Sequence, residues 1–230
     1  IETPDRARNI IQAAKRGAGD LPVSVKTRVG YNHDQLDEWL PVLLSAEPAV
    51  VTIHARTRKE LSKVPAEWER VARAVAIRDA ARSSTLIFGN GDVLSRADAY
   101  KKATQSGADG VMVGRALFGN PWFFHPTKRL PVSLTALPTS GVDRDSIVTT
   151  DTSEVGLEYI DLPERLRVLV EHTQLFEELL SFKNFAIMKK HYKAYVSGFP
   201  GAAELRAELM LCNDGAAVAS LVESWLQNRC

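Results

Sequence analysis

Ala49-Val50-Val51-Thr52-Ile53-His54-Ala55-Arg56-Thr57 is the stretch of sequence that decides the fold of this chain. Residues 49–53 form an apolar run of the kind found in parallel strands that are buried on both faces. Polar residues follow the run directly. The same order of a strand-like run and then polar or glycine residues occurs three more times, with a helix-like segment between successive copies. The other copies end in Lys26-Thr27-Arg28, Asn90-Gly91-Asp92 and Gly114-Arg115.

The first half of the chain alternates between strand-like and helix-like segments. A first helix is predicted from an N-cap at Thr3 to about residue 17. Further helices are expected at 34–45, 66–81 and 95–106, the last one capped by Ser95 and ended by Gly107. Strands are expected at 21–25, 49–53, 85–88 and 111–113. This alternation predicts an α/β fold with a parallel sheet. Because a closed (β/α)₈ barrel needs eight strands, the four strands form either part of a barrel or an open sheet.

The second half of the chain has a different pattern. Residues 126–160 are rich in Pro, Gly, Ser, Thr and Asp, which is typical of a linker or an insertion. Helices are predicted from Asp161, over 182–196, over 202–211, and from a cap at Asn213 or Asp214. We therefore expect an α/β domain at 1–125, a linker at 126–160 and a small helical bundle at 161–230.

The composition is that of an ordinary globular protein. The 230 residues are 45% hydrophobic and 25% charged, with a net charge of +1. No apolar run is long enough to span a bilayer, so we expect no membrane partner. Cys212 and Cys230 lack metal-ligand spacing and an activating partner, and two cysteines are typical of a reducing, cytoplasmic compartment. Because the chain does not begin with Met, we expect that its true N-terminus is missing.

The polar residues at the strand ends are the candidate site. In a barrel, the C-terminal ends of the strands face one mouth, so these residues would meet around one ligand. Lys26 suits a ligand that gains negative charge, although it could simply reach solvent. Arg28 suits a polyanionic substrate or a structural salt bridge. His54 is interpreted as a cofactor contact rather than a core histidine, and a general-base role is disfavoured because nothing nearby in the sequence orients it.

The glycine-containing motifs predict a phosphate site. Glycines around Asn90 let the backbone approach a ligand and present its amides, and Arg115 follows a glycine one unit later. Barrels often bind phosphate in the loops after their last two strands. The alternative is an ordinary turn.

A basic segment in the second half is a candidate surface for nucleic acid. It carries four lysines and no acidic residue, with Tyr192 and Tyr195 between them as possible stacking partners. The alternative is a solvated helix face. The lysines are Lys183, Lys189, Lys190 and Lys193.

These motifs together resemble the tRNA-dihydrouridine synthases. The resemblance rests on residues 23–28, 53–57, 89–92 and 114–122, and on Gly198-Phe199-Pro200-Gly201-Ala202 with the basic segment before it. It implies strands five to eight of an FMN-binding (β/α)₈ barrel, followed by a helical tRNA-recognition domain. It also implies that FMN, reduced by NADPH, passes hydride to a tRNA uracil, which must leave its stack to react.

The resemblance also implies roles for individual residues. Lys26 and His54 match flavin contacts. Arg56 would lie near the flavin and the target base, with Arg28 and Thr57 also on the substrate side. The remaining matches are on the phosphate side of FMN: Asn90, Gly91, Asp92, Gly114 and Arg115.

The chain departs from the family pattern in three respects. The catalytic cysteine of the family belongs to the loop after the fourth strand, so we expect no catalytic residue and little activity in the chain as given. Ala55 stands where the family often has glycine, and the loop of residues 59–68 has an unusual sequence. We also expect self-association through the strand edge at residues 21–25.

Two other functions stay open at this stage. One is a different FMN-binding barrel oxidoreductase that acts on a small molecule, such as a dihydroorotate-dehydrogenase-like enzyme. The other is a catalytically inactive fragment that binds RNA.

Overall fold

The computed structural model describes residues 3–130 and 158–228, so most of the predicted linker at 126–160 lies outside the described residues. The described residues form two compact units, with a boundary between Arg115 and Ala116. The domain limits expected from the sequence, 125 and 160, stay predictions.

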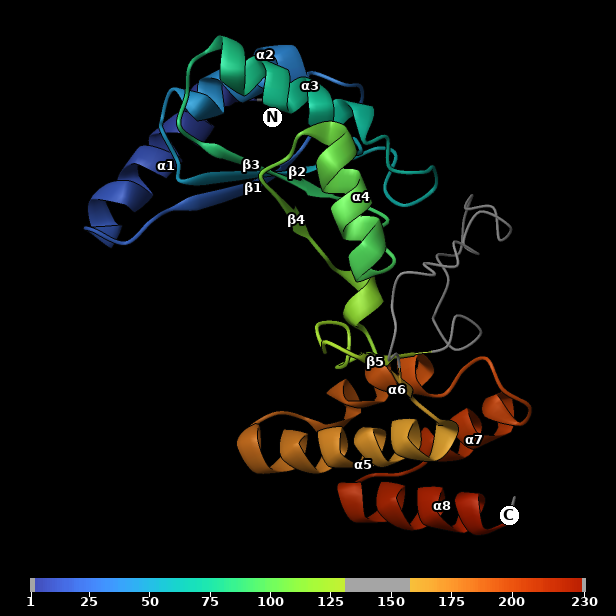
Figure 1. Ribbon diagram of the computed structural model, residues 1–230. Coiled ribbons are helices and arrows are strands. Elements are labelled where there is room, and N and C mark those ends of the chain that lie inside the picture. The colour runs from blue at the N-terminus through green and yellow to red at the C-terminus, as the bar shows by residue number, and fades with distance from the viewer. Residues whose placement is uncertain (1–2, 131–157, 229–230) are drawn as a thin grey trace. The chain divides into compact units, whose positions relative to one another are not determined.

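The first unit alternates helices and strands as the sequence predicts. Its four strands are parallel and lie in the order β1-β2-β3-β4 (Figure 1). The elements are α1 (Pro4–Ala18), β1 (Ser24–Arg28), α2 (Leu36–Leu44), β2 (Val50–His54), α3 (Glu69–Ala80), β3 (Leu86–Asn90), α4 (Arg96–Ser106) and β4 (Gly110–Met112). A mixed α/β fold with a parallel sheet is therefore confirmed.

One face of the sheet builds the core of this unit. Val51, Ile53 and Ile87 are fully buried in a cluster with Leu36 and Leu40 of α2. Figure 1 shows α1 to α4 following one another along the sheet, and each helix contacts the next. Since successive strand residues point to opposite faces, the residues between these apolar ones lie on the other face.

The strand register decides which polar residues share that other face. Arg28 pairs with His54, and His54 pairs with Asn90. Lys26 lies two residues before Arg28 on the same strand, so it shares their face. The hydroxyl of Thr27 accepts a hydrogen bond from Trp39 of α2 (2.9 Å), which places Thr27 on the helix side.

Several predicted boundaries were wrong by a few residues. Lys26-Thr27-Arg28 lies within β1 rather than after it, because pairing with β2 extends the strand to Arg28. Thr3 precedes α1, but its side chain makes no capping hydrogen bond. Ser95 does cap α4 through the amide of Asp98 (3.0 Å), and Gly107 ends that helix with a φ of 70°.

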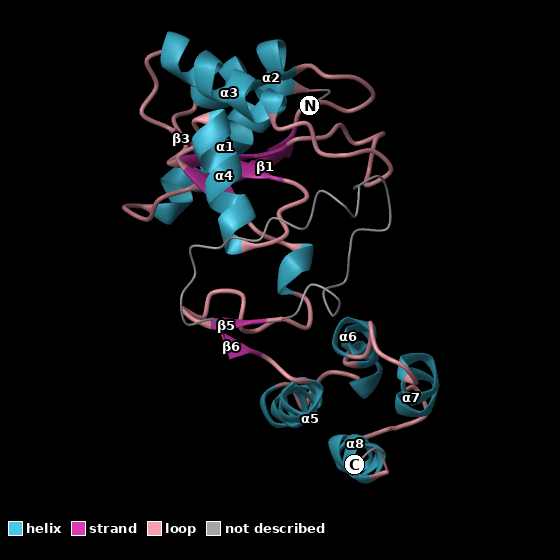
Figure 2. Ribbon diagram, turned by 45° about the vertical axis from the view of Figure 1, so that its right-hand side comes forward, coloured by secondary structure: helices cyan, strands magenta, loops and turns pink. Residues whose placement is uncertain are grey.

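The second unit is mainly helical, and Figure 2 views its principal helices nearly end-on. Asp161 and Asp214 cap α5 and α8 through backbone amides, both at 2.7 Å, as their positions in the sequence predict. The elements are η1 (Arg115–Leu117, which begins at the unit boundary), β5 (Lys128–Arg129), β6 (Glu158–Tyr159), α5 (Leu162–Leu179), η4 (Phe185–Ile187), α6 (Lys189–Tyr195), α7 (Ala202–Leu209) and α8 (Gly215–Gln227). The two short strands pair in parallel.

A buried arginine joins two of these helices. Arg165 of α5 is 1% exposed and donates to the carbonyl oxygens of Ala194 (2.6 Å) and Ser197 (3.2 Å) at the end of α6. Its burial lowers its pKa to about 10. The carbonyl end of a helix carries partial negative charge, which compensates part of the cost of burying the guanidinium.

A bilayer-crossing helix is absent from the described ranges, where no helix joins sufficient length with sufficient hydropathy.

Candidate active site

Side-chain hydrogen bonds join β1, β3 and β4 near their ends, on the face of the sheet away from the core. Lys26 of β1 donates its ammonium to Oδ1 of Asn90 on β3 (3.0 Å). Asn90 in turn donates to the carbonyl of Met112 on β4 (2.7 Å). The structure therefore brings the predicted residues at the ends of β1 and β3 together, and their roles in binding stay predictions.

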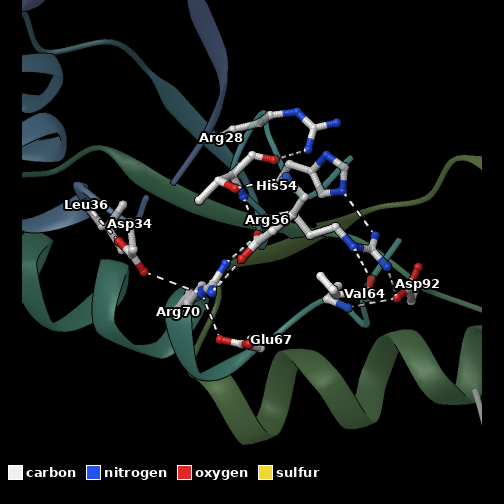
Figure 3. Close-up of polar contacts among 12 residues, drawn as sticks. Arg28, Asp34, Leu36, His54, Arg56, Val64, Glu67, Arg70 and Asp92 are labelled. Atoms are coloured by element: carbon white, nitrogen blue, oxygen red, sulfur yellow. Dashed lines mark hydrogen bonds and ion pairs between the residues drawn. The ribbon is translucent and has the colours of Figure 1, made fainter. Parts of the chain in front are cut away.

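A second network joins the end of β2 to the residues after β3 and β4, and Figure 3 shows the part of it that links His54, Arg56 and Asp92. The carboxylate of Asp92 accepts hydrogen bonds from the guanidinium groups of Arg56 and Arg115, the latter at 2.7 Å. Arg56 also lies 3.4 Å from Nε2 of His54 through its Nη1. All four predicted motifs thus meet at one edge of the sheet, and two cations share one carboxylate there.

His54 lies in an environment that opposes its protonation. Burial, together with the neighbouring cations Arg28, Lys26 and Arg56, lowers the pKa of His54 to about 4 against the opposing charge of Asp92. The imidazole is therefore neutral at neutral pH. The sequence offered no residue to orient this histidine, whereas the structure supplies Arg56, two residues further along the chain.

Beside the end of β1 lies a shallow, open cationic cavity of about 390 Å³. It is lined by Lys26, Thr27, Arg28, Tyr31 and Arg58. Partial burial lowers the pKa of Lys26, and the charge of Arg28 lowers it further. Arg28 is held in place by donating to the carbonyl of Thr57 (2.8 Å). Tyr31 and Arg58 were not singled out in the sequence, because each lies further along the loop after its strand than the motif residues do.

The loop after β2 is held against the site by buried polar contacts. Arg56 is 2% exposed and donates Nε to the carbonyl of Val64 (2.7 Å), while Asp92 accepts from the amide of Ala66 (2.9 Å). Further along the loop, Glu60 accepts from the amide of Thr57 (2.6 Å) and pairs with Arg70 of α3 (2.8 Å). The unusual loop sequence thus forms an ordered wall beside His54.

Two glycines are required by close packing at this wall. A Cβ on Gly89 would overlap the indole of Trp68, whose Nε1 donates to the carbonyl of Gly91 (2.9 Å). Gly91 has a φ of 128°, and a Cβ there would lie 2.7 Å from Ala66. A Cβ on Gly114, in contrast, would meet nothing within 4 Å. Gly114 therefore leaves room for a ligand beside the backbone.

The basic segment of the second unit differs from the prediction in one respect. Tyr192 and Tyr195 are 1% and 4% exposed and belong to the helical core, so the interpretation of these rings as stacking partners was wrong. Their positions on α6 face α5 and α7, and only the full fold reveals which face of a short helix is buried. Burial raises the pKa of Tyr192 to about 12.

The lysines of this segment remain candidates for binding anions. Lys183, Lys190 and Lys193 are exposed. Lys189 is half-buried and donates to the carbonyl of Met210 (2.7 Å), so its charge also holds the start of α6 against the end of α7.

Cysteine and metal chemistry gain no support from the described residues. Burial raises the pKa of the Cys212 thiol, which makes it a weaker nucleophile at neutral pH. Cys230 lies outside the described residues. Within the described ranges there is no group of three or more His, Cys, Asp or Glu side chains that could hold a metal ion.

Comparison with known proteins identifies the family. A family model described as dihydrouridine synthase (Dus) matches residues 1–229. The chain belongs to the dihydrouridine synthase family. A probable tRNA-dihydrouridine synthase of Staphylococcus aureus (strain N315) is 36% identical over 228 residues, which are 98% of this chain and 60% of that protein. The corresponding protein of Staphylococcus epidermidis (strain ATCC 12228) is 35% identical over the same share of each chain.

A third dihydrouridine synthase relative, probable tRNA-dihydrouridine synthase 2 of Bacillus subtilis (strain 168), is 35% identical over 96% of this chain and 60% of its own length. The chain thus spans about 60% of the length of the relatives that it matches. A solved structure of 2,3-dimethylmalate lyase aligns with 97% of this chain and 73% of its own, with 15% identity and a TM-score of 0.39, a score too low to inform the fold.

Proposed function

We propose that this chain supplies flavin-binding and tRNA-binding parts of a tRNA-dihydrouridine synthase, which reduces uridine to 5,6-dihydrouridine in cytoplasmic tRNA. Membership of the dihydrouridine synthase family and relatives named as tRNA-dihydrouridine synthases support the substrate and the reaction. NADPH is the proposed reductant. A uridine within folded tRNA must leave its stack to reach such a site.

The fold is proposed to be part of a (β/α)₈ barrel. The parallel order β1-β2-β3-β4, with helices on one face, suits strands five to eight of such a barrel. In this proposal residues 1–125 belong to the barrel, residues 126–160 connect it to the next domain, and residues 161–230 form a helical domain that contacts tRNA.

The residues at the strand ends fit FMN. Bound FMN, once reduced by NADPH, would supply the hydride that adds to the uracil ring. Lys26 and His54 offer an ammonium and a neutral imidazole for the acceptor edge of the isoalloxazine. The phosphate would lie beside the turns after β3 and β4, where Gly114 is exposed and Arg115 brings a positive charge. Gly91 is buried and would shape the turn after β3. Asn90 and Asp92 would hold Lys26 and the two arginines in place.

The substrate is proposed to contact the cationic cavity and the basic segment. Arg28 lines the cavity, and Arg56 and Thr57 form the buried wall next to it. The phosphates of tRNA would bind the exposed lysines of the basic segment, namely Lys183, which precedes α6, and Lys190 and Lys193 on α6, with Lys189 at the start of that helix.

The observation that carries this proposal is the hydrogen bond between Lys26 and Asn90 across β2, on the same face as His54. The test is the dihydrouridine content of tRNA in a host that lacks its own dihydrouridine synthases. Expression of the complete protein should restore dihydrouridine in tRNA hydrolysates measured by mass spectrometry, and the Lys26→Ala variant should restore much less. Normal uridine in every tRNA after expression of a folded protein would refute the proposal.

A further inference from the structure

We propose that Arg56 holds His54 as the neutral tautomer with its proton on Nδ1, so that the imidazole presents an N–H donor to the bound ligand. This inference deepens the proposed function and rests on it for the identity of the ligand. It assigns Arg56 the role of a positioning residue, which acts on the ligand through His54.

The direction of the contact between the two side chains follows from their chemistry. Nη1 of Arg56 lies 3.4 Å from Nε2 of His54 (Figure 3). A guanidinium has N–H donors and no acceptor, so a hydrogen bond between these atoms requires a lone pair on Nε2. A neutral imidazole carries one proton, and that proton must then lie on Nδ1.

The guanidinium cannot turn away from the histidine without losing buried hydrogen bonds. Its Nε donates to the carbonyl of Val64 (2.7 Å), and its Nη2 donates to Asp92. Asp92 is fixed in turn by the amide of Ala66 (2.9 Å) and by Arg115 (2.7 Å). Because Arg56 is 2% exposed, water cannot replace these partners. The donor that faces Nε2 is therefore preorganised.

The surroundings of His54 also exclude its doubly protonated form at neutral pH. The charged groups around the ring are Lys26 and Arg28 on β1, Arg56 after β2, and Asp92 after β3. Burial disfavours the charged ring most, and three cations outweigh one carboxylate. With Nε2 engaged by Arg56, a protonated ring would place a second N–H against a guanidinium that can only donate.

The tautomer of His54 decides which groups of the ligand can form a hydrogen bond with it. An Nδ1–H group binds a carbonyl oxygen or an unprotonated ring nitrogen and rejects an N–H. On an isoalloxazine ring this favours the carbonyl oxygens and N1 over the N3–H group. Together with the ammonium of Lys26, two donors would then converge on one acceptor edge, where a reduced flavin carries negative charge.

The test is heteronuclear NMR of the full chain labelled with ¹⁵N-histidine. His54→Gln assigns the signals of residue 54 among the five histidines. At pH 7, without ligand, we expect a protonated-type shift for Nδ1 and an unprotonated-type shift for Nε2. A ring protonated on Nε2, or on both nitrogens, would overturn the inference. This measurement needs no variant of Arg56 and no flavin.

Two variants test the part that Arg56 plays. Arg56→Lys keeps a positive charge but cannot reach three acceptors at once, so the single Nδ1–H signature should be lost to a mixture of tautomers. Lys101→Met, on the exposed face of α4, is the control that should leave the tautomer unchanged. Arg115→Gln removes one of the two groups that fix Asp92, so it should weaken the signature less than Arg56→Lys does. An unchanged tautomer in a folded Arg56→Lys chain would show that another group positions His54.

Addition of FMN separates this inference from the proposed function. We expect the Nδ1 proton of His54 to persist and its resonance to shift when FMN binds. If the complete protein does not bind FMN, the proposed function fails, whereas the tautomer of the free chain still decides the role of Arg56. A tautomer that changes on FMN binding would contradict the preorganisation argued above.

Discussion

Replacement of Glu60 by Gln tests whether the loop after β2 is held by charge. The carboxylate of Glu60 accepts from the amide of Thr57 (2.6 Å) and from two nitrogens of Arg70, at 2.8 and 3.1 Å. The amide of Glu60 in turn donates to the hydroxyl of Thr57 (3.2 Å). These contacts hold the start of the loop after β2. The loop continues to Val64, whose carbonyl accepts a hydrogen bond from the buried Arg56.

The magnitude follows from the pKa of Glu60. Hydrogen bonding by Arg70 is the largest effect and, with the amide of Thr57, lowers this pKa from 4.5 to about 2. At about 1.4 kcal/mol for each pH unit, the carboxylate stabilises the folded state by about 3.5 kcal/mol at pH 7 before any allowance for its exposure. Because 24% of the side chain is exposed and Gln keeps one acceptor, we expect Glu60→Gln to cost about 2 kcal/mol.

Glu67→Gln is the matched control for this change. Glu67 pairs with the same guanidinium, through Nε of Arg70 (2.8 Å), but 56% of its side chain is exposed. Exposed ion pairs contribute roughly 0–1 kcal/mol, so this variant should behave almost as the wild type. The comparison separates the effect of the partly buried contacts of Glu60 from the effect of removing one negative charge near Arg70.

Hydrogen exchange followed by mass spectrometry measures the loss of local stability in the loop after β2. Peptides within residues 55–71 should lose roughly 30-fold in protection in Glu60→Gln at pH 7, since 2 kcal/mol corresponds to that factor. The depressed pKa makes this contribution complete above pH 4.5 and lost as the pH falls towards 2. The difference between wild type and variant should therefore be constant from pH 7 to 5 and shrink below 4.5. Equal protection in Glu60→Gln and Glu67→Gln would refute the reasoning.

Three further predictions concern packing and binding. Gly89→Ala should destabilise the first unit by about 1–3 kcal/mol, because its Cβ overlaps the adjacent indole; hydrogen exchange of β3 measures this loss. Lys26→Met should weaken FMN binding about tenfold, measured by quenching of flavin fluorescence, whereas Lys101→Met on the exposed face of α4 should not. Replacing Lys190 and Lys193 by Ala should weaken tRNA binding and reduce the slope of log affinity against log salt by roughly 1–2, while Lys101→Met leaves the slope unchanged.

The sequence predicted helix starts well where they depend on contacts between residues that are close in the chain. Ser95, Asp161 and Asp214 cap their helices as expected, because an N-cap needs only its own side chain and an amide three residues on. Thr3 failed as a cap although its type is suitable. The strand limits shifted because they depend on the partner strand, as at Arg28, which pairs with His54.

The site could be predicted as a set of residues but not as a network. The alternation of strands and helices was enough to place Lys26, His54 and Asn90 at one edge of the sheet. It could not pair Asp92 with Arg56, since these residues are far apart in sequence and their contact depends on the turn after β3. Nor could it show that Tyr192 faces the core, because a short basic helix with several aromatic residues has no clear periodicity.

The pairing of Arg56 with Asp92 is better explained by positioning than by stability. A buried ion pair pays a desolvation cost that its attraction barely offsets, and apolar residues of similar volume are often at least as stabilising. This pair nevertheless fixes three features of one site, namely the carbonyl of Val64, Nε2 of His54 and the guanidinium of Arg115. One carboxylate between two guanidinium groups also leaves a net positive charge. An anionic ligand would complete that balance, which agrees with the phosphorylated cofactor proposed above.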